Sequence, residues 1–322
     1  MSNTEGDEVC ANCGKAAVDN VKLKICTACK LVKYCSVDCQ KNHRPQHKKA
    51  CKKRAAEIRD DRLFTQLDES HWGECPLCCL PLSIDTDLSS QSSCCCKRIC
   101  DGCEYANMLR EREQGLEHRC AFCREPFPDT DEEHKKNYMH RMKANDPKAF
   151  CGMGQMCLYE GNDEGAFEYY TKAAELGDVA AHWNLSIYYN EGIVVEKNEK
   201  RAVYHWEKAA IGGHPFARYN LGNHEFRNRR IDRAVKHWII AANQGFDDAL
   251  DVVRQGFRKG YVSKEEYAST LRGHQAAVDA TKSEQRDAAY YVLSEKRKKV
   301  ANRCQIAGGV TKKFTKKGSR KG

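Results

Sequence analysis

The sequence lacks the features of a secreted or membrane-spanning protein. Residues 1–8 carry neither a basic leader nor an apolar core, so we expect no signal peptide. No stretch approaches the roughly 20 consecutive apolar residues that a membrane helix requires. These absences predict a soluble, intracellular protein that folds in a reducing compartment, where dense cysteines favour metal binding over disulfides.

Acidic residues are missing from the C-terminal tail. Residues 296–322 contain eleven Lys or Arg and no Asp or Glu, although the whole chain has a formal net charge of +9. The preceding residues therefore sum to −2. A tail this polar is predicted to be disordered, and its isolated basicity argues against a nucleic-acid partner. Lys296-Arg297-Lys298-Lys299 fits a nuclear localisation signal as well as a solvated helix end, so we expect a cytoplasmic location with the nucleus as an alternative.

Cysteine, by contrast, is abundant and clustered. The chain has 20 cysteines in 322 residues, and 17 of them fall between Cys10 and Cys123. The first group forms four short pairs within 42 residues, namely Cys10 and Cys13, Cys26 and Cys29, Cys35 and Cys39, and His47 and Cys51. Ligands separated by two or three residues can reach one ion from a tight turn, and eight ligands make two tetrahedral zinc sites. A segment this small cannot bury enough apolar surface to fold without metal.

The spacing of this first group resembles that of the MYND finger family. The resemblance is carried by Tyr34-Cys35-Ser36-x2-Cys39-Gln40 followed by His47-Lys48-x2-Cys51, and it covers the whole ligand set. It implies an interleaved arrangement, with Cys10, Cys13, Cys35 and Cys39 on one ion and Cys26, Cys29, His47 and Cys51 on the other. MYND fingers generally bind short proline-containing peptides, and many carry a Trp between the sixth and seventh ligands. Arg44 stands there in this chain, which removes an apolar surface that such peptide binding would use.

A second group of cysteines follows. It reads Cys75 and Cys78, then the run Cys94-Cys95-Cys96, then Cys100 and Cys103, and finally Cys120 and Cys123. This order resembles the RING family in its all-cysteine form, whose first and third pairs share one zinc ion while the second and fourth share the other. The resemblance implies one site made of Cys75, Cys78, Cys100 and Cys103, and another made of Cys120, Cys123 and two cysteines of the run.

The spacing leaves open which two cysteines of the run bind zinc. A common RING pattern has a histidine ligand three residues before the fifth ligand, but Lys97 stands there, so the ligands must lie upstream. Related sequences with a Cys-Cys-x-Lys pattern favour Cys94 and Cys95. Cys96 and Cys79 are then spare thiols.

The resemblance to RING domains implies a function in ubiquitin transfer. A RING has no catalytic nucleophile, because it acts by holding a ubiquitin-conjugating enzyme and its thioester-linked ubiquitin in a reactive orientation. Three residues fit the family's contact pattern: Leu77 inside the first pair, Arg124 directly after the last ligand, and Pro126. The alternative is a non-enzymatic zinc scaffold in which Leu77 and Pro126 only pack the finger and Arg124 is a surface charge.

Helices are predicted around the two modules. A basic linker helix is expected over 52–70, and an amphipathic helix over 101–114 should place Tyr105, Met108, Leu109 and Arg112 against the zinc core. Thr130-x2-Glu133 predicts a capping box at the start of a further linker helix within 129–146.

From residue 147 the chain repeats. The segment from Tyr170 to Gly177 recurs from Trp206 to Gly213 and from Trp238 to Gly245, at periods of 36 and 32 residues. Each copy combines an aromatic residue, an alanine pair and a final glycine, which predicts a helix that packs closely on its neighbours and ends in a left-handed cap. The pattern resembles the Sel-like subclass of tetratricopeptide-related repeats over 147–260, and this implies a short right-handed solenoid.

The sequence therefore predicts small zinc-binding modules, a MYND finger and a RING cross-brace, followed by an all-α helical-repeat solenoid. Four zinc ions are the expected cofactors. A ubiquitin-conjugating enzyme and a protein substrate held by the repeats are the expected partners, and no membrane or small-molecule partner is expected. The predicted boundaries are 1–9 disordered, 10–51 MYND finger, 52–70 linker helix, 71–128 RING-type finger, 129–146 linker helix, 147–260 repeats, 261–295 capping helices and 296–322 disordered.

Overall fold

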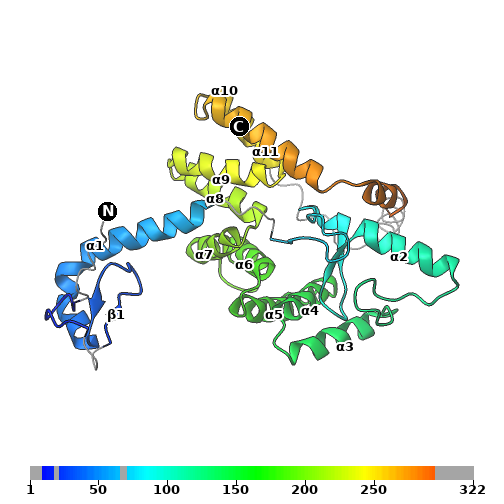
Figure 1. Ribbon diagram of the computed structural model, residues 1–322, viewed down its shortest axis with the longest axis horizontal. Coiled ribbons are helices and arrows are strands. Elements are labelled where there is room, and N and C mark those ends of the chain that lie inside the picture. The colour runs from blue at the N-terminus through cyan, green and yellow to red at the C-terminus, as the bar shows by residue number, and fades with distance from the viewer. Residues whose placement is uncertain (1–8, 18–21, 66–70, 294–322) are drawn as a thin grey trace. The chain divides into compact units, whose positions relative to one another are not determined.

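The computed structural model describes residues 9–17, 22–65 and 71–293. The chain divides into two compact units, with the boundary between residues 66 and 67, and each is described by itself (Figure 1). The predicted disordered tail and its candidate nuclear localisation signal lie outside the described residues. So does the predicted disordered N-terminal segment, except for Val9, which forms an antiparallel bridge with Ala16.

The first unit consists of a two-stranded ribbon and one long helix. Its elements are β1 (Lys24–Ile25), β2 (Lys33–Tyr34) and α1 (Val37–Phe64), and β1 pairs antiparallel with β2. Helix α1 begins within the cysteine cluster, well before the linker helix predicted over 52–70. It starts there because the Ser36 hydroxyl accepts a hydrogen bond from the Cys39 amide at 3.1 Å and so caps the helix. Leu63 is the one fully buried residue of this helix, whose residues are all described. Cys39, His47 and Cys51 are half-buried, and most of its lysines and arginines are exposed.

The second cysteine module, residues 71–128, consists of two knuckles, a small ribbon and a helix. Its elements are η1 (Thr86–Leu88), β3 (Ser89–Gln91), β4 (Arg98–Cys100) and α2 (Asp101–Glu113), and β3 pairs antiparallel with β4. A bridge closes each knuckle, one between Glu74 and Pro81 and one between Arg119 and Pro126. The core contains little besides cysteine and a few apolar side chains such as Ile99, which is typical of a fold that depends on metal.

Helix α2 buries a polar face, whereas the sequence predicts an apolar one. Asn107 and Glu111 are buried, and Arg112, which was expected to face the core, is exposed. The Asn107 amide donates to the Arg119 carbonyl oxygen at 3.0 Å, and the Glu111 carboxylate lies 2.9 Å from His118 Nδ1. These hydrogen bonds fix α2 to the last knuckle, because the buried backbone groups of a small core need partners.

Behind this module the described chain is helical. The helices are α3 (Asp131–Met142), α4 (Pro147–Tyr159), α5 (Asp163–Glu175), α6 (Val179–Glu191), α7 (Glu199–Ile211), α8 (Pro215–Arg227), α9 (Ile231–Asn243), α10 (Asp247–Arg258) and α11 (Lys264–Ala280). A further helical segment covers residues 284–293. Consecutive helices from α3 to α11 lie side by side as hairpins (Figure 1). Helices α4 to α10 lie in the repeat region predicted over 147–260, α3 lies in the predicted linker and α11 in the predicted capping region. Among the described residues no helix is both long and apolar enough to span a bilayer.

Local capping signals mark the repeat boundaries. Asp146 accepts a hydrogen bond from the Lys148 amide at 3.0 Å at the start of α4. Gly177, Gly213 and Gly245 have φ angles of 91°, 87° and 88°. Glycine adopts this left-handed conformation without a steric penalty, so the predicted glycine caps are confirmed.

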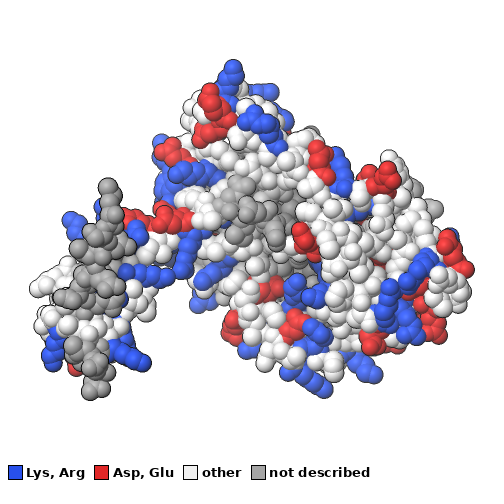
Figure 2. All heavy atoms as spheres, in the orientation of Figure 1, with Lys and Arg blue, Asp and Glu red and all other residues white. Residues whose placement is uncertain are grey.

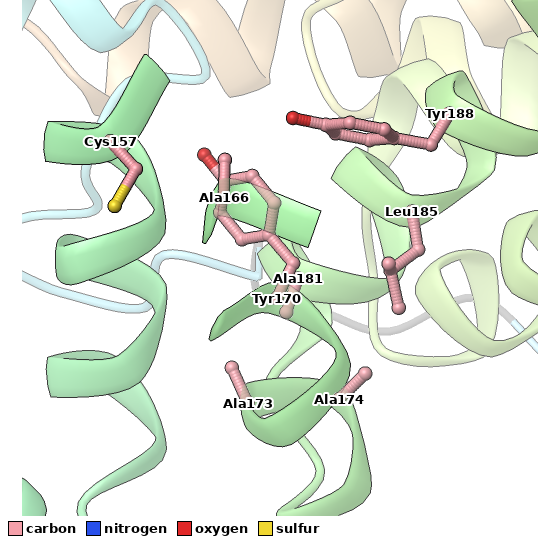
Figure 3. Close-up of a cluster of buried hydrophobic side chains, with 8 residues drawn as sticks. All are labelled: Cys157, Ala166, Tyr170, Ala173, Ala174, Ala181, Leu185 and Tyr188. Atoms are coloured by element: carbon pink, nitrogen blue, oxygen red, sulfur yellow. The ribbon is translucent and has the colours of Figure 1, made fainter. Parts of the chain in front are cut away.

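The repeated aromatic and alanine side chains form the core of the array. Tyr170 is fully buried, and Trp206 and Trp238 are 3% and 4% exposed, which confirms the prediction for these residues. The cluster drawn in Figure 3 contains Cys157, Ala166, Tyr170, Ala173, Ala174, Ala181, Leu185 and Tyr188. The alanines let neighbouring helices approach closely while the aromatic ring fills the space between them.

A small residue faces the aromatic side chain from the preceding helix, at a position that the predicted pattern does not include. A Cβ atom on Gly154 would lie 2.7 Å from the Tyr170 ring, and one on Gly222 would lie 2.4 Å from Nε1 of Trp238. Ser186, which is fully buried, holds the equivalent place in α6. Each hairpin therefore closes because these positions carry no large side chain.

Within the second unit, the second cysteine module packs against the array through Cys96. This side chain is 2% exposed and shares a buried cluster with Tyr138 of α3 and with Ala149 and Met153 of α4. A buried free thiol behaves as a small hydrophobe, so Cys96 contributes an apolar contact.

A second contact between the module and the array is aromatic. The ring centroid of His71 lies 4.2 Å from that of His214, which precedes α8, and His214 stacks on Trp183 at 4.9 Å. Trp72 holds the Arg98 guanidinium over its ring at 4.0 Å. The ring nitrogens of His71 are buried, and this burial lowers the pKa of His71 to about 3, so the imidazole is neutral.

Candidate metal centres

The eight predicted ligands of the first unit come together in two groups of four. One group contains Cys10, Cys13, Cys35 and Cys39, and the other contains Cys26, Cys29, His47 and Cys51. The donor atoms of each group lie within 4.8 Å of one another. The Sγ atoms of Cys13 and Cys35 are 3.6 Å apart, and those of Cys26 and Cys51 are 3.8 Å apart. Sulfur ligands about 2.3 Å from a tetrahedral zinc ion are separated by about 3.8 Å, so this donor set fits zinc.

Helix α1 places ligands of both groups on one face. Cys39, His47 and Cys51 are spaced in multiples of four residues, so they lie along the same side of the helix. His43 fills the remaining place in this row, where its Nδ1 lies 3.0 Å from the Tyr34 hydroxyl and its ring stacks on His47 at 5.6 Å. Tyr34 and His43 therefore support the orientation of the ligand histidine.

The predicted ligands of the second cysteine module also form two groups. Cys75, Cys78, Cys100 and Cys103 make one, and Cys94, Cys95, Cys120 and Cys123 make the other. The Sγ separation is 3.7 Å between Cys78 and Cys100 and 3.9 Å between Cys95 and Cys120. The first pair thus lies with the third and the second with the fourth, an interleaved arrangement in which each ion would join distant parts of the module.

The run of three cysteines divides between two environments. Cys94 and Cys95 join the second group, whereas Cys96 turns toward the array. The backbone of Cys96 is left-handed, with a φ of 55°, and Cys79 after the first pair has a φ of 56°. Cys79 directly follows the ligand Cys78, and Cys96 directly follows the ligand Cys95. Both lie outside the ligand groups, where the chain turns.

Hydrogen bonds among the thiols lower the pKa of one cysteine in each group of the second module. The Cys100 thiol lowers the pKa of Cys75 to about 4, and the Cys95 thiol lowers the pKa of Cys120 to about 3. The pKa of each of these partners is raised, first by the same hydrogen bond and then by burial. A lowered pKa favours the thiolate, which is the form that binds zinc.

The three residues predicted to contact a conjugating enzyme lie on the two knuckles. Leu77 is 42% exposed, and Arg124 and Pro126 are also exposed. Arg124 has a φ of 65°, and its Nη1 donates a hydrogen bond to Asn107 Oδ1 at 2.7 Å. The Arg124 guanidinium is thus held against α2.

Three residues lie beside the candidate zinc ligands but were not predicted from the sequence as part of the sites: His43, Ser92 and Arg286. His43 has a sequence signal, because it lies four residues before a ligand on the same helix face. The Ser92 hydroxyl lies 3.5 Å from Cys120 Sγ, and Nη2 of Arg286 lies 3.3 Å from Cys78 Sγ. Arg286 and Cys78 are 208 residues apart, and no local pattern connects them.

Comparison with known families matches two parts of the chain. Residues 10–51 match the MYND finger family, and residues 147–178, 179–214 and 215–246 match the Sel1 repeat family. These matches bear out the predicted MYND and Sel-like resemblances and support a zinc-finger scaffold for protein interactions. Neither family match includes residues 71–128.

Two solved structures are similar to the chain at low sequence identity. One is a Sel1 repeat protein from Oxalobacter formigenes, with 20% identity and a TM-score of 0.40 over 54% of this chain and 72% of that one. The other is c5321, a protective antigen present in uropathogenic Escherichia coli strains and displaying an SLR fold, with 15% identity and a TM-score of 0.31 over 68% of this chain and 57% of that one. Comparison with curated proteins gave no match.

Proposed function

We propose that the chain is a zinc-dependent scaffold whose second cysteine module acts as the RING-type domain of a ubiquitin-protein ligase. The observation that carries the proposal is the interleaved pairing of this module, in which the first and third cysteine pairs share one group and the second and fourth share the other. Helix α2 begins within the third pair, at Asp101, and ends before the fourth pair, as a helix would in a RING cross-brace.

The donor sets fit four zinc ions, two in each module, because every group offers four thiol or imidazole ligands at tetrahedral spacing. Zinc bound there would act as a structural ion that fixes the knuckles. Reduced thiols are required at all four groups, which fits the proposed intracellular location.

The proposed catalysis is positioning. Leu77, Arg124 and Pro126 would contact the conjugating enzyme and its ubiquitin from the two knuckles. No nucleophile of this chain takes part, because the ubiquitin thioester is already on the partner enzyme. Holding that thioester and an acceptor amine in a reactive orientation lowers the entropic part of the barrier.

The repeat array would recruit the protein substrate. Apolar side chains stand exposed on it, among them Tyr159 at 82% and Tyr204 at 52%. On the visible face of the second unit, basic and acidic side chains are interspersed (Figure 2), so the surface suits a protein partner better than a nucleic acid.

A non-enzymatic scaffold is the second candidate function, and one observation favours it. Arg124 donates to Asn107 on its own module, so its guanidinium would have to leave that partner to bridge a conjugating enzyme and ubiquitin. If the hydrogen bond persists in every complex, the module would only bind a partner.

The test is ubiquitin-chain formation by the full chain with activating enzyme, ubiquitin and a panel of conjugating enzymes. The full chain is required because the module packs against the array through Cys96 and His71. Leu77→Ala should weaken capture of the conjugating enzyme while zinc is retained. Leu116→Ala, which truncates another exposed leucine of the module, should leave capture unchanged.

The role of Arg124 is tested separately. Arg124→Ala should slow ubiquitin discharge while binding of the uncharged conjugating enzyme persists, because orientation is lost and affinity is not. Arg112→Ala, at an exposed arginine of α2, is the matched control. If the wild-type chain forms no ubiquitin chains with any conjugating enzyme of a broad panel, the non-enzymatic scaffold becomes the supported function. The same holds if wild type and Arg124→Ala discharge ubiquitin equally fast.

A further inference from the structure

The last described helical segment, residues 284–293, packs back on the second cysteine module (Figure 1). The Gln285 amide donates to the carbonyl oxygen of Gly102, at the start of α2, at 3.1 Å. Ala289 is fully buried. A segment beyond the repeats therefore contacts a knuckle that precedes them.

Arg286 makes the closest approach to the zinc ligands. Its Nη2 lies 3.3 Å from the Sγ atom of Cys78 and 3.1 Å from the Leu80 carbonyl oxygen. Its Nη1 donates to the carbonyl oxygens of Pro81 and Thr281 at 2.7 and 2.8 Å. The guanidinium thus connects the candidate ligand Cys78 and the turn after Cys78 to the chain just before the helical segment that carries Arg286.

The position of Arg286 is fixed by the backbone on both sides. A Cβ atom on Gly102 would lie 3.0 Å from the Cα and N atoms of Arg286, so only glycine permits this approach. On its own side, the Arg286 amide donates to the Ser283 hydroxyl at 3.3 Å, which caps the segment at its start.

A zinc ion with four thiolates has a net charge of −2, and burial makes that charge costly unless hydrogen-bond donors surround it. The group that contains Cys120 has a neutral partner, the Ser92 hydroxyl, whose oxygen accepts a hydrogen bond from the Cys120 thiol at 3.5 Å. The group that contains Cys78 receives a cation, and a charge-assisted hydrogen bond is stronger than a neutral one. The two groups of one module are thus supported by different chemistry.

We propose that Arg286 is a positioning residue of the zinc site formed by Cys75, Cys78, Cys100 and Cys103, and that residues 281–293 slow the release of its ion. The proposal rests on the proposed zinc occupancy of this group and does not require ligase activity. Since Leu77 lies between Cys75 and Cys78, the same contact fixes the knuckle that carries a proposed conjugating-enzyme contact.

The experiment measures which cysteines become reactive when zinc leaves the full chain. Zinc-loaded protein is mixed with excess chelator and N-ethylmaleimide, and labelled peptides are quantified by mass spectrometry over time. In Arg286→Ala the four cysteines of this group should be labelled about 10-fold to 100-fold faster than in wild type, the range seen when an outer-shell partner is lost. The cysteines of the Cys94 group and of the first unit should keep their wild-type rates.

Two further variants separate positioning from general unfolding. Gly102→Ala should displace residues 284–293 while favouring α2, because alanine is the better helix former, and it should give the same selective acceleration. Arg286→Lys keeps the positive charge and should restore part of the protection. Arg272→Ala, at an exposed arginine of α11, is the matched control and should behave as wild type.

Equal labelling rates in wild type, Arg286→Ala and Gly102→Ala would overturn the proposal, although zinc occupancy would stand. Acceleration of both groups of the module alike would also overturn it, because that result indicates general loosening. Rapid labelling of wild type before chelator is added would show that the group holds no zinc, and the proposed occupancy would fall together with the inference.

Discussion

In the first unit, the candidate ligands are surrounded by little besides one another: the buried cluster consists of Cys10, Cys26, Cys29 and Tyr34, and Cys13 is exposed. In the second cysteine module, the corresponding groups lie in a structure that is supported from outside, by α3 and α4 at Cys96, by α8 at His71 and by residues 281–293 at Cys78. Two modules with the same number of ligands thus differ in what else holds them together. We therefore expect the described part of the first unit to depend mainly on bound zinc, and the second module to share its stability with the repeat array.

The largest effect should follow zinc removal. Structural zinc contributes an apparent 10–16 kcal/mol, about as much as a small domain's whole stability, so chelation should unfold residues 10–51. Amide hydrogen exchange read by mass spectrometry should show complete loss of protection there, while α4 to α10 keep theirs. Adding zinc back should restore protection. Persistent protection of residues 10–51 after chelation would contradict the difference between the modules.

The second experiment weakens the core of the repeat array and leaves the zinc ligands unchanged. Trp206 fills the core of its hairpin, and truncating a buried Trp to Ala costs about 3–5 kcal/mol, so Trp206→Ala should lower the free energy of unfolding of the array by that amount. Tyr204→Ala, at a residue that is 52% exposed, should change it by less than about 0.5 kcal/mol. Urea unfolding gives both values. Zinc content of the first unit should not change in either variant, and a loss of zinc there would show that the units are coupled.

The cysteine run distinguishes ligand from packing residue. The Cys94→Ser variant should bind one zinc ion fewer than wild type. Cys96→Ser should lose no zinc ion, but should destabilise the array by about 1–3 kcal/mol, because a hydroxyl is buried among apolar side chains. Native mass spectrometry counts the ions and urea unfolding measures the stability. An ion lost from Cys96→Ser and kept by Cys94→Ser would reverse the assignment.

The smallest effect concerns the histidine contact. Burial, together with the nearby charges of Arg98 and Lys148, lowers the pKa of His71 to about 3 in the folded protein, against about 6.5 in the unfolded chain. The unfolded state therefore binds the proton first, and stability is lost as the pH falls below about 6.5. Between pH 7 and 5.5 the loss should be about 1 kcal/mol for this group.

His71→Phe should remove that part of the pH dependence. Urea midpoints of wild type and variant, compared at pH 7 and 5.5, measure it. His140→Phe, at an exposed position of α3, should keep the wild-type slope. If wild type and His71→Phe lose the same stability on acidification, the imidazole is not buried as a neutral group.

Local signals account for what the sequence predicts well. The members of each ligand pair are at most four residues apart, and helix caps are formed by residues such as Asp146 and Gly213, which lie directly at the start or the end of a helix. The repeats are visible as a period. The buried face of α2 was predicted wrongly because Asn107 and Glu111 satisfy backbone and histidine groups of another knuckle. The early start of α1 depends on Ser36, a single capping residue.

The contacts between the second module and the array could not be predicted in the same way. Arg286 and Cys78 come together only after every intervening hairpin has stacked. The pairing of His71 with His214 is of the same kind. A single sequence carries periodicity and capping signals, but it holds no signal for which distant surfaces meet.

The four groups of ligands are expected to hold four zinc ions, with the second module paired as a cross-brace. Native mass spectrometry of the purified full chain tests this expectation directly, since each ion adds a resolvable mass. We expect four zinc ions in wild type and three after substitution of Cys75 and Cys78 together by alanine. A further substitution of Cys94 and Cys95 should leave two. Two ions in the wild-type chain, or no loss on substituting Cys75 and Cys78, would contradict it.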